Sequence, residues 1–579
     1  MDRKWILKAK ADKENVSQRA KALNINDHLA TLRLQRNIET FDQARQFFRP
    51  SLNDLHDPFL MQDMDKAIER LDKALQDKQK ILVYGDYDVD GTTSVSLVYN
   101  YLKSLNDNIG YYVPDRYNEG YGISFEGLDY AVEKEYDLII ALDCGIKAID
   151  KAAYASEHNI DLIICDHHTP GDEIPNAVAV LDPKRSDCDY PYKHLSGCGV
   201  GFKLLQAYAQ HNNHDENSLF QMLDLVVVSI GSDIVPITGE NRILAHYGLK
   251  VLNKAPQTGL KTIIELAGLK DRDIVISDIV FKLGPRINAA GRMESGKTAV
   301  ELLVSEDESL AVDIGNQINE INDERKTKDH EITDQAMEQI AEDIKGRNRK
   351  TTVVHSEDWH KGVIGIVASR LIEHHFRPTV VLTESNGFLS GSARSVPGFN
   401  LYGAIEHCSH LLEDFGGHMY AAGMTLKPEN LDDFKMCFEE YVSKHISPEQ
   451  LIPSIDADLE IEVKDITPKF FRILKQFAPF GPDNMKPVFI ARNVYDNGNA
   501  RKVGKSGEHL KLKVIQHLGD NLSIDAIGFG FGKYYDDITN FNPFDICFTI
   551  EENVFMNKKS LQMMIRDIIP YGKTESQQQ

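Results

Sequence analysis

Cysteine is scarce in this sequence, and no two cysteines form a CxxC pair. The seven cysteines stand at positions 144, 165, 188, 198, 408, 437 and 547. This spacing argues against a zinc ribbon or a disulfide framework and is typical of proteins from a reducing compartment. We therefore expect a cytoplasmic protein.

The sequence also lacks long apolar runs and any excess of basic residues. The run from Leu223 to Gly231 is far shorter than the roughly 20 apolar residues of a membrane span, and the first residues, MDRKWILKAKADKENV, are too charged for a signal peptide. We expect no contact with a membrane. Lys and Arg total 65 against 88 Asp and Glu, a net charge of −23. This balance excludes a uniformly basic nucleic-acid coat but allows a local basic groove.

The 579 residues are enough for several domains. Residues 1–75 are predicted to form a helical extension. From Lys80 onward, short apolar runs such as ILVYG, DLIIALD and DLIICD alternate with helix-length segments. Continuous apolarity is typical of strands buried on both faces, so residues 76–298 predict an α/β domain with a parallel sheet.

Three further segments follow this domain. Residues 299–348 are highly charged and predict one or two long helices that join separate lobes, although an ordinary amphipathic core helix fits them equally well. Residues 349–447 predict a second α/β lobe. After the linker ISPEQLIPS, five short strands within residues 452–573 predict a small β-barrel or sandwich.

The motif YGDYDVDG places Asp86, Asp88 and Asp90 directly after a predicted strand. Three carboxylates in five residues repel one another unless cations are bound, and oxygen ligands suit magnesium or manganese. The alternative is an acidic turn in which Asp90 caps the helix that begins near Thr92. The motif alone does not decide between the two.

Similar residues follow three other apolar runs: Asp143, the triplet Asp166-His167-His168, and Asp233. Ligands of open α/β sheets collect at the carboxyl ends of strands. Each motif alone could be a cap or a turn, but together, on elements of one sheet, they favour a two-metal centre. Two divalent ions would activate water for phosphoryl transfer, and His168 would contact a phosphate.

Basic residues in two other regions suggest contacts with phosphate. Arg116, Arg286, Arg292 and Arg394 stand near glycines, which suits phosphate recognition, although a surface salt bridge is the commoner role of an arginine. The Gly416-Gly417-His418 segment of FGGHMYAAG could likewise contact phosphate or form a tight turn that packs two helices, and its residues alone do not decide between the two. The β segment carries a further group of basic and aromatic residues. Either a groove that binds single-stranded nucleic acid or a solvated strand face would explain this group, which consists of Arg501, Lys502, Lys505, His509, Lys511, Lys513, Phe529, Phe531, Tyr534 and Tyr535.

With DYDVDG, DCG, DHH and Asp233 in this order, the chain resembles the DHH phosphoesterase superfamily. Its motifs VPDRYNEGYG, GVGFKL, GENR, GPRINAAGRM, GSARS and FGGHMYAAG resemble the RecJ branch, the bacterial single-strand-specific 5′→3′ DNA exonucleases, over residues 30–570. The resemblance implies a DHH domain, a DHH-associated domain joined by a long helix, and an OB-fold.

The resemblance also implies roles for single residues. The ligands of two Mn²⁺ or Mg²⁺ ions would be Asp88, Asp90, Asp143, His167 and Asp233. Asp86, Asp166 and His168 would act in catalysis, by supporting these ligands or contacting phosphate. The substrate would be bound by Arg116, Arg286, Asn288, Arg292, Ser392, Arg394 and His418.

A monomeric exonuclease that releases 5′ mononucleotides from single-stranded DNA, in repair and recombination, is thus implied. Single-strand-binding protein and a RecQ-type helicase would be its partners. The alternatives are a phosphodiesterase for oligonucleotides or cyclic dinucleotides, whose members usually end after the associated domain, and a silent nucleic-acid-binding protein. Two features depart from the resemblance. Tyr84 replaces a His found in many superfamily members. The segment PFGPDNMKP replaces PFGxGNPxP and so loses a Gly and a Pro at the entrance to the OB-fold, where they bear on how this domain docks.

Overall fold

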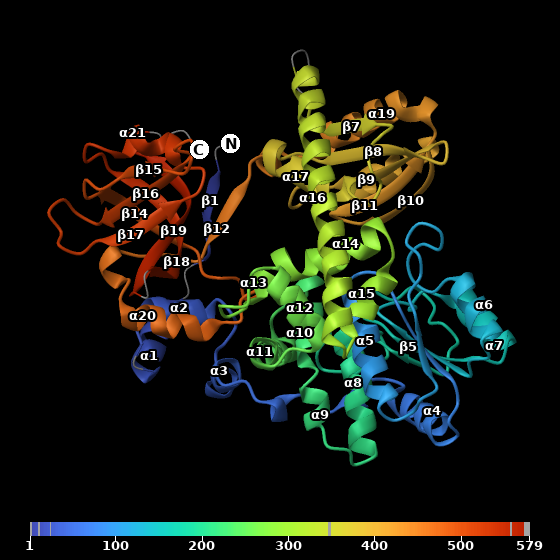
Figure 1. The fold of residues 1–579 in the computed structure, drawn as a ribbon. Helices are drawn as coiled ribbons and strands as arrows, with labels where there is room; N and C mark the ends of the chain where they lie inside the picture. Colours follow the sequence, from blue (N-terminus) through green and yellow to red (C-terminus); the bar gives the residue numbers. More distant parts are fainter. Residues whose placement is uncertain (1–2, 10–11, 24, 345–348, 556–557, 573–579) are drawn as a thin grey trace.

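The computed structural model describes residues 3–9, 12–23, 25–344, 349–555 and 558–572. Figure 1 shows two α/β lobes, one above the other, with a β-barrel beside them. A single long helix, α16 (Glu308–Ile344), runs from the lower lobe into the upper one. The predicted fold class, a parallel-sheet domain joined by a long helix to a second α/β domain, with a C-terminal barrel, is confirmed. The expected boundaries at 348 and 573 lie outside the described residues.

The lower lobe is built on a five-stranded, fully parallel sheet. In spatial order its strands are β3 (Ile109–Tyr112), β2 (Ile81–Gly85), β4 (Leu138–Leu142), β5 (Asp161–Cys165) and β6 (Ala179–Leu181). All residues of β2 and β4 are buried. Helices cover both faces, which explains the continuous apolar runs. On one face lie α4 (Met64–Gln76), α5 (Val89–Lys103) and α8 (Gly197–His211), and on the other α6 (Phe125–Glu133) and α7 (Ile149–Glu157).

The apolar run before Asp233 is a helix, α10 (Leu223–Ser232), and not part of the sheet. The expectation that all four acidic motifs lie on one sheet is therefore wrong. A helix buried on every side is apolar all round, so its sequence cannot be distinguished from that of a buried strand. Helix α10 packs against α5 and α11 (Gly239–Lys254), and the lobe is completed by α12 (Thr258–Leu266), α14 (Gly284–Met293) and α15 (Gly296–Leu303).

The upper lobe has a mixed five-stranded sheet. Its order is β10 (Leu412–His418), β11 (Ala421–Leu426), β9 (Phe388–Arg394), β8 (Thr379–Ser385) and β7 (Thr352–Ser356), with helices α17 (Ile364–His375), α18 (Leu401–His407) and α19 (Leu431–His445). The motif FGGHMYAAG forms the β10–β11 hairpin, so the alternative of a turn that packs two helices is wrong. Its small residues pair across the hairpin, Gly416 with Gly423 and Gly417 with Ala422.

The C-terminal strands close into a barrel, because β14 pairs with both β18 and β16. Its strands are β14 (Phe489–Asp496), β16 (His509–Ile515), β17 (Ile524–Gly528), β18 (Phe544–Phe555) and β19 (Lys558–Pro570), with the short β13 (Leu459–Glu460) and β15 (Arg501–Val503) at its rim. The N-terminal strand β1 (Lys4–Leu7) pairs with β12 (Ser454–Ala457), the strand that leads into the barrel. Helices α2 (Asp27–Leu34), α3 (Phe41–Phe48) and α20 (Pro468–Leu474) pack against the barrel, and α1 (Lys13–Leu23) packs on α2.

Among the described helices, none combines the length and the apolar character that crossing a bilayer would require.

Candidate metal centre

The site forms where neighbouring strands of the lower sheet end. Asp86, Asp143 and Asp166 directly follow β2, β4 and β5, which are adjacent in the sheet. Asp88 caps α5, because its Oδ1 accepts a hydrogen bond from the backbone N–H of Gly91 at 3.1 Å. The alternative in which Asp90 is the N-cap is therefore wrong, since Asp90 lies inside the first turn.

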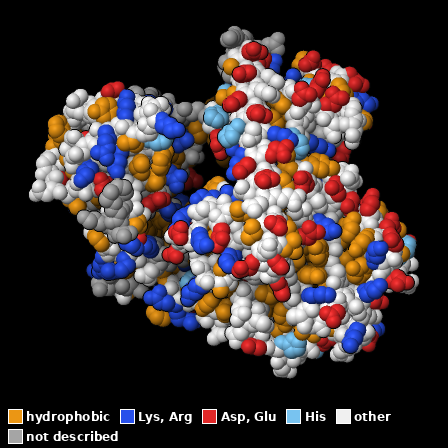
Figure 2. All heavy atoms as spheres, in the orientation of Figure 1, with side chains coloured by type: hydrophobic (Ala, Val, Ile, Leu, Met, Phe, Trp, Pro, Cys, Tyr) orange, Lys and Arg blue, Asp and Glu red, His pale blue; other side chains and the backbone are white. Residues whose placement is uncertain are grey.

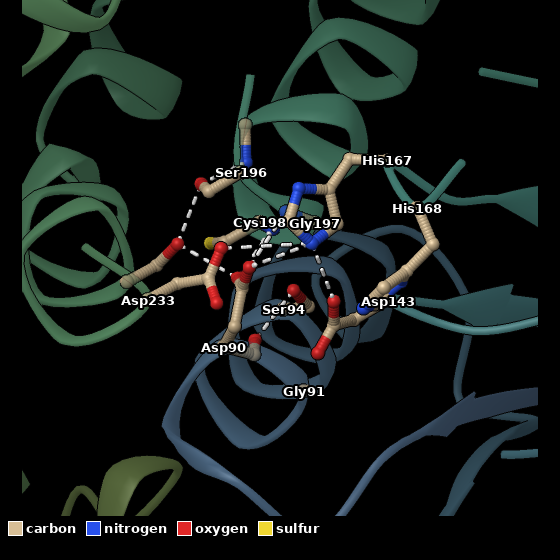
Figure 3. Close-up of polar contacts among 12 residues, drawn as sticks. Asp90, Gly91, Ser94, Asp143, His167, His168, Ser196, Gly197, Cys198 and Asp233 are labelled. Atoms are coloured by element: carbon tan, nitrogen blue, oxygen red, sulfur yellow. Dashed lines mark hydrogen bonds and ion pairs between the residues drawn. The ribbon is translucent and has the colours of Figure 1, made fainter. Parts of the chain in front are cut away.

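Asp90 is instead held by two other helices (Figure 3). Its Oδ2 accepts from the N–H of Gly197 at 2.7 Å, and its Oδ1 accepts from the N–H of Cys198 at 2.8 Å and the hydroxyl of Ser229 at 2.7 Å. Gly197 and Cys198 belong to the first turn of α8, where free N–H groups and the helix dipole favour an anion. These three donors fix the carboxylate in one orientation.

His167 points its second ring nitrogen at three carboxylates (Figure 3). Its Nδ1 lies 3.0 Å from the carbonyl oxygen of Leu195, which only accepts, so Nδ1 carries the proton and Nε2 presents a lone pair. Nε2 lies 3.1 Å from Asp143, 3.6 Å from Asp233 and 3.7 Å from Asp90. Burial lowers the pKa of His167, so the imidazole is neutral.

These atoms fit a bound cation. The buried Nε2 of His167, Oδ1 of Asp143 and Oδ2 of Asp86 have no hydrogen-bond partner among the described residues. Buried acceptors that face one another without a donor are unfavourable, and a divalent cation would satisfy them. In two sets of residues, Asp143-His167-His168 and Asp90-His167-Asp233, the candidate ligand atoms all lie within 4.8 Å of one another. Imidazole together with carboxylate oxygens suits Mn²⁺.

The carboxylates also repel one another strongly. Burial and then the charges of Asp90 and Asp88 raise the pKa of Asp233 to about 8. Burial and then Asp88 raise the pKa of Asp86 to about 8, and burial and neighbouring carboxylates raise the pKa of Asp143 well above its ordinary value. A cluster of this kind requires positive charge in its middle to stay ionised at neutral pH. Asp88 belongs to the cluster electrostatically, besides capping α5.

Asp166 and His168 form a separate pair beside the cluster. Asp166 accepts from the N–H groups of Ile146 at 2.9 Å and His167 at 2.7 Å, and from Nδ1 of His168 at 2.8 Å. Burial opposes ionisation of Asp166, but its interactions with His168 outweigh burial and lower its pKa to about 2. Asp166 therefore orients the two histidines and has little capacity left for a metal.

Arginines from both lobes gather next to the carboxylates. Burial, and then the charge of Arg116, lower the pKa of Arg292 to about 10, with Arg325 and Arg394 adding to this effect. Arg116 lies over the ring of Tyr87 at 5.0 Å, and Arg394 donates to Ser392 at 3.0 Å. Within the described residues, Arg116, Arg292 and Arg394 have no carboxylate within ion-pair distance. Such a cluster of uncompensated cations favours a bound anion.

The other expected substrate residues lie differently. Arg286 donates to Asn319 Oδ1 at 3.2 Å and to the carbonyl of Lys282 at 2.7 Å. Asn288 lies on the same helix, α14, and is partly exposed. His418 is exposed at the end of β10. Their roles in substrate binding stay predictions.

Sequence reasoning missed several residues that build the centre. Tyr121 places its hydroxyl 3.1 Å from the carbonyl of Asp143 and 3.1 Å from Nε2 of His168. Gly197 faces Asp143 so closely that a Cβ there would lie 2.6 Å from the aspartate Cβ. The glycine-rich segment SGCGVG, residues 196–201, was the visible signal, because such segments often mark close backbone approach.

The barrel carries a basic face on β15 and β16. Arg501, Lys502, Lys505 and Lys513 are exposed there, and the nearby ring of Phe529 is 57% exposed. His509 contacts the Phe529 ring edge-on, with 5.0 Å between centroids. Figure 2 shows Lys and Arg side chains at the lower edge of the hollow between the barrel and the lobes.

Known protein families match the lower lobe, the upper lobe and the barrel. The DHH family N-terminal domain matches residues 80–230, the DHHA1 domain residues 348–444, and the RecJ OB domain residues 457–567. The chain is 35% identical over 566 residues to the single-stranded-DNA-specific exonuclease RecJ of Bacillus subtilis, covering 97% of this chain and 70% of that protein. It is 31% identical over 527 residues to RecJ of Escherichia coli, covering 88% and 90%.

Two solved structures are similar in fold. The crystal structure of RecJ in complex with Mn²⁺ from Thermus thermophilus matches with a TM-score of 0.83 at 24% identity, covering 98% of this chain and 79% of the other. An exonuclease RecJ bound to manganese matches with a TM-score of 0.60 at 28% identity, covering 69% and 99%.

Proposed function

This chain belongs to the RecJ family of single-stranded-DNA-specific exonucleases, and from that membership we propose that it hydrolyses single-stranded DNA from the 5′ end, releasing 5′ mononucleotides. One observation of the site carries the proposal. The unpartnered Nε2 of His167 faces the unpartnered Oδ1 of Asp143 at 3.1 Å, beside arginines that have no carboxylate within ion-pair distance among the described residues. This arrangement suits a metal-dependent attack on a phosphodiester.

Two divalent cations, Mn²⁺ or Mg²⁺, would be held by Asp90, Asp143, His167 and Asp233, with Asp88 alongside. When bound, such ions polarise the phosphate and lower the pKa of water enough to make a nucleophile at neutral pH. The protein's part is to keep the ligands ready. The Leu195 carbonyl holds the His167 proton on Nδ1, and the α8 N–H groups hold Asp90 in place.

His168 contacts a phosphate oxygen of the substrate. Burial opposes its protonation, but the hydrogen bond with Asp166 outweighs burial and raises the pKa of His168. The resulting imidazolium can donate from Nε2 while Nδ1 stays bonded to Asp166. Its side chain is 41% exposed, so a substrate can reach it.

The 5′ end of the strand lies in the arginine cluster of Arg116, Arg292 and Arg394, with Ser392. These side chains come from both lobes, so a strand that enters must pass between them. A passage that admits one backbone and unstacked bases would reject a duplex. The basic face of the barrel, with the exposed Phe529 ring, binds the strand further along.

The setting of this activity follows from the family resemblance. The exonuclease acts in the cytoplasm, in repair and recombination, as a monomer that works with single-strand-binding protein and a RecQ-type helicase. The seven cysteines, all within the described residues, are free thiols, in agreement with a reducing compartment. Co-elution of the purified chain with either partner in gel filtration would test these associations.

End-labelled DNA tests the polarity. With Mn²⁺ and a single-stranded oligonucleotide labelled at its 5′ end, we expect a labelled mononucleotide as the first product. The same oligonucleotide labelled at its 3′ end should give a descending ladder, and the matching duplex should resist both reactions. Release of a labelled mononucleotide from the 3′ end first would contradict the proposal.

A further inference from the structure

The loop that carries Asp233 is strained. It comprises residues 233–238, between α10 and α11, and is called the Asp233 loop below. Ile234, directly after the ligand, has a φ of 58°, a left-handed conformation that a β-branched residue rarely adopts. Its side chain is 59% exposed, so its own packing does little to hold it. Strained backbone of this kind persists only where the surroundings hold it in place.

The barrel holds one end of this loop. The segment between α20 and β14, residues 476–487, is called the barrel segment below and contains PFGPDNMKP. The backbone N–H of Ile237, a fully buried residue, donates to the carbonyl of Pro482 at 2.9 Å. Gly481 lies against Ile237 so closely that a Cβ at Gly481 would meet Ile237 Cγ1 at 2.4 Å.

Arg242, in the first turn of α11, also binds the barrel segment. Its guanidinium lies 3.7 Å from the centroid of the Phe47 ring. All its hydrogen bonds go to carbonyl oxygens: Phe47 at 3.0 Å, Phe477 at 3.0 Å, Ala478 at 2.8 Å, Pro479 at 3.2 Å and Gln476 at 3.5 Å. Four of these five belong to the barrel segment. Asn484 stabilises the fold of that segment, since its side-chain amide donates to the carbonyl oxygens of Phe477 and Pro479, each at 2.8 Å.

The residue directly before Arg242 connects this contact to His167. The amide of Asn241 donates to the carbonyl of Pro236, in the Asp233 loop, at 3.1 Å, and to the carbonyl of His194. His194 directly precedes Leu195, whose carbonyl fixes the proton of His167. One turn of α11 therefore supports two candidate ligands, Asp233 and His167.

We propose that docking of the barrel through Arg242 positions Asp233, so that the barrel sets the cation affinity of the metal centre. Arg242 is thus a positioning residue that touches neither metal nor DNA. The inference rests on the proposed metal centre. The departures in PFGPDNMKP leave this contact intact, because Asp483 adopts a left-handed φ of 58°, which aspartate tolerates, and the Met485 side chain is 64% exposed.

Mn²⁺ affinity of the full chain, measured without DNA by electron paramagnetic resonance of the free ion, tests this proposal. Arg242→Met should weaken the affinity at least about tenfold, the usual size of an outer-sphere effect. Arg33→Met is the matched control. Arg33 is equally buried and donates to the carbonyls of Glu39 and Thr40 at 2.8 and 3.2 Å, but these contacts stay within the N-terminal helices. Its Mn²⁺ affinity should stay within about twofold of wild type.

Ile234→Asn supplies the second arm of the test. Asparagine adopts the left-handed conformation readily, so this change should restore most of the Mn²⁺ affinity in the Arg242→Met background. If Arg242→Met does not fold by circular dichroism, Gly481→Ala takes its place, because its Cβ pushes directly on Ile237.

Wild-type affinity in a folded Arg242→Met protein, or an equal loss in Arg33→Met, would overturn the positioning role. Failure of the wild-type chain to bind Mn²⁺ would overturn the proposed function instead, so the two failures are distinguishable.

Discussion

Asp143 reaches the metal centre through an unusual backbone conformation. Its φ is 59°, in the left-handed region, which aspartate tolerates better than most residues. This conformation follows the last residue of β4 and directs the carboxylate toward His167. Asp233 is followed by another left-handed residue, Ile234. Backbone strain collects where function needs a side chain in one fixed place.

Asp143→Asn should abolish cleavage while DNA binding persists. The amide keeps the shape but loses the charge that balances a divalent ion, so we expect the rate to fall at least about a hundredfold. Affinity for single-stranded DNA should change less than about twofold, since the arginine cluster and the barrel face are untouched. Cleavage and filter-binding assays measure the two effects. Asp150→Asn, at an exposed site, is the control; surviving cleavage would refute the assignment of Asp143.

Gly197→Ala should damage the centre through packing alone. The added Cβ would lie 2.6 Å from Asp143 Cβ and 2.7 Å from its Oδ1, so the ligand must move. We expect a rate at least about tenfold lower at saturating DNA, and weaker Mn²⁺ binding. Gly199→Ala, two residues along α8, is matched because its Cβ would meet atoms no nearer than 3.4 Å. Equal effects of the two changes on steady-state kinetics would argue against a steric cause.

At the scale of elements, α16 carries a polar cluster at the junction of the lobes. Asp329 is fully buried, and Arg370 of α17 reaches its Oδ2 at 2.8 Å. Arg325 and Asn322, one and two turns earlier on α16, are buried as well. The long helix is therefore bound to the upper lobe by a charge pair in addition to the apolar contacts of Ile332, Ala336 and Ile340.

Arg370→Met should destabilise this junction. Removing the arginine leaves a buried carboxylate without its ion-pair partner, which costs about 3 kcal/mol. Urea unfolding monitored by circular dichroism measures the loss. In the Asp329→Asn background the same change should cost much less, because no buried charge remains. An equal cost in both backgrounds would show that Arg370 stabilises by packing.

Helix α11 should make the fold sensitive to acid. His246 lies one turn from Arg242 and one turn from Lys250, and burial and then these two cations lower its pKa from 6.5 to about 4. As the pH falls, the unfolded chain therefore takes up this proton before the folded chain does. The contribution of neutral His246 to the free energy of unfolding is present above pH 6.5 and is lost as the pH falls through about 4. His246→Gln should show a smaller fall in melting temperature over this range. The exposed His410→Gln should behave as wild type.

At the scale of the whole molecule, the two lobes and the barrel would each contribute something different to the proposed reaction. The lower lobe would supply the metal ligands, the upper lobe would supply Arg394 and Ser392, and the barrel would supply its basic face. The barrel also contacts the Asp233 loop. The net charge of −23 is compatible with a DNA substrate because the arginine cluster and the exposed basic residues of β15 and β16 provide positive charge locally.

Adding Mn²⁺ should stabilise the metal-stripped protein. Cations relieve the repulsion among the buried carboxylates, and an ion at a hundred times its dissociation constant contributes about 2.7 kcal/mol. We expect the melting temperature in scanning fluorimetry to rise by several degrees over that in EDTA. Asp143→Asn should lose most of this increment, and its metal-free form should melt no lower than the metal-free wild type. A wild-type melting temperature unaffected by Mn²⁺ would contradict the metal centre.

The amino-acid pattern by itself determined much of the lower lobe and the barrel. Continuous apolarity in ILVYG and DLIIALD can be satisfied only between two layers, and parallel strands bring Asp86, Asp143 and Asp166 to one edge. The five barrel strands were equally visible as β-prone runs separated by turns, although β18 and β19 are longer than the expected short strands.

Tertiary structure decided what joins these parts. The apolar run before Asp233 is buried on every side, so its hydrophobic periodicity does not distinguish a helix from a strand. Asp90, His167 and Arg242 are held mainly by backbone groups, including those of Gly197, Leu195 and the barrel segment. Every residue offers the same N–H and C=O, so no side-chain pattern names these partners, and only the folded chain places them together.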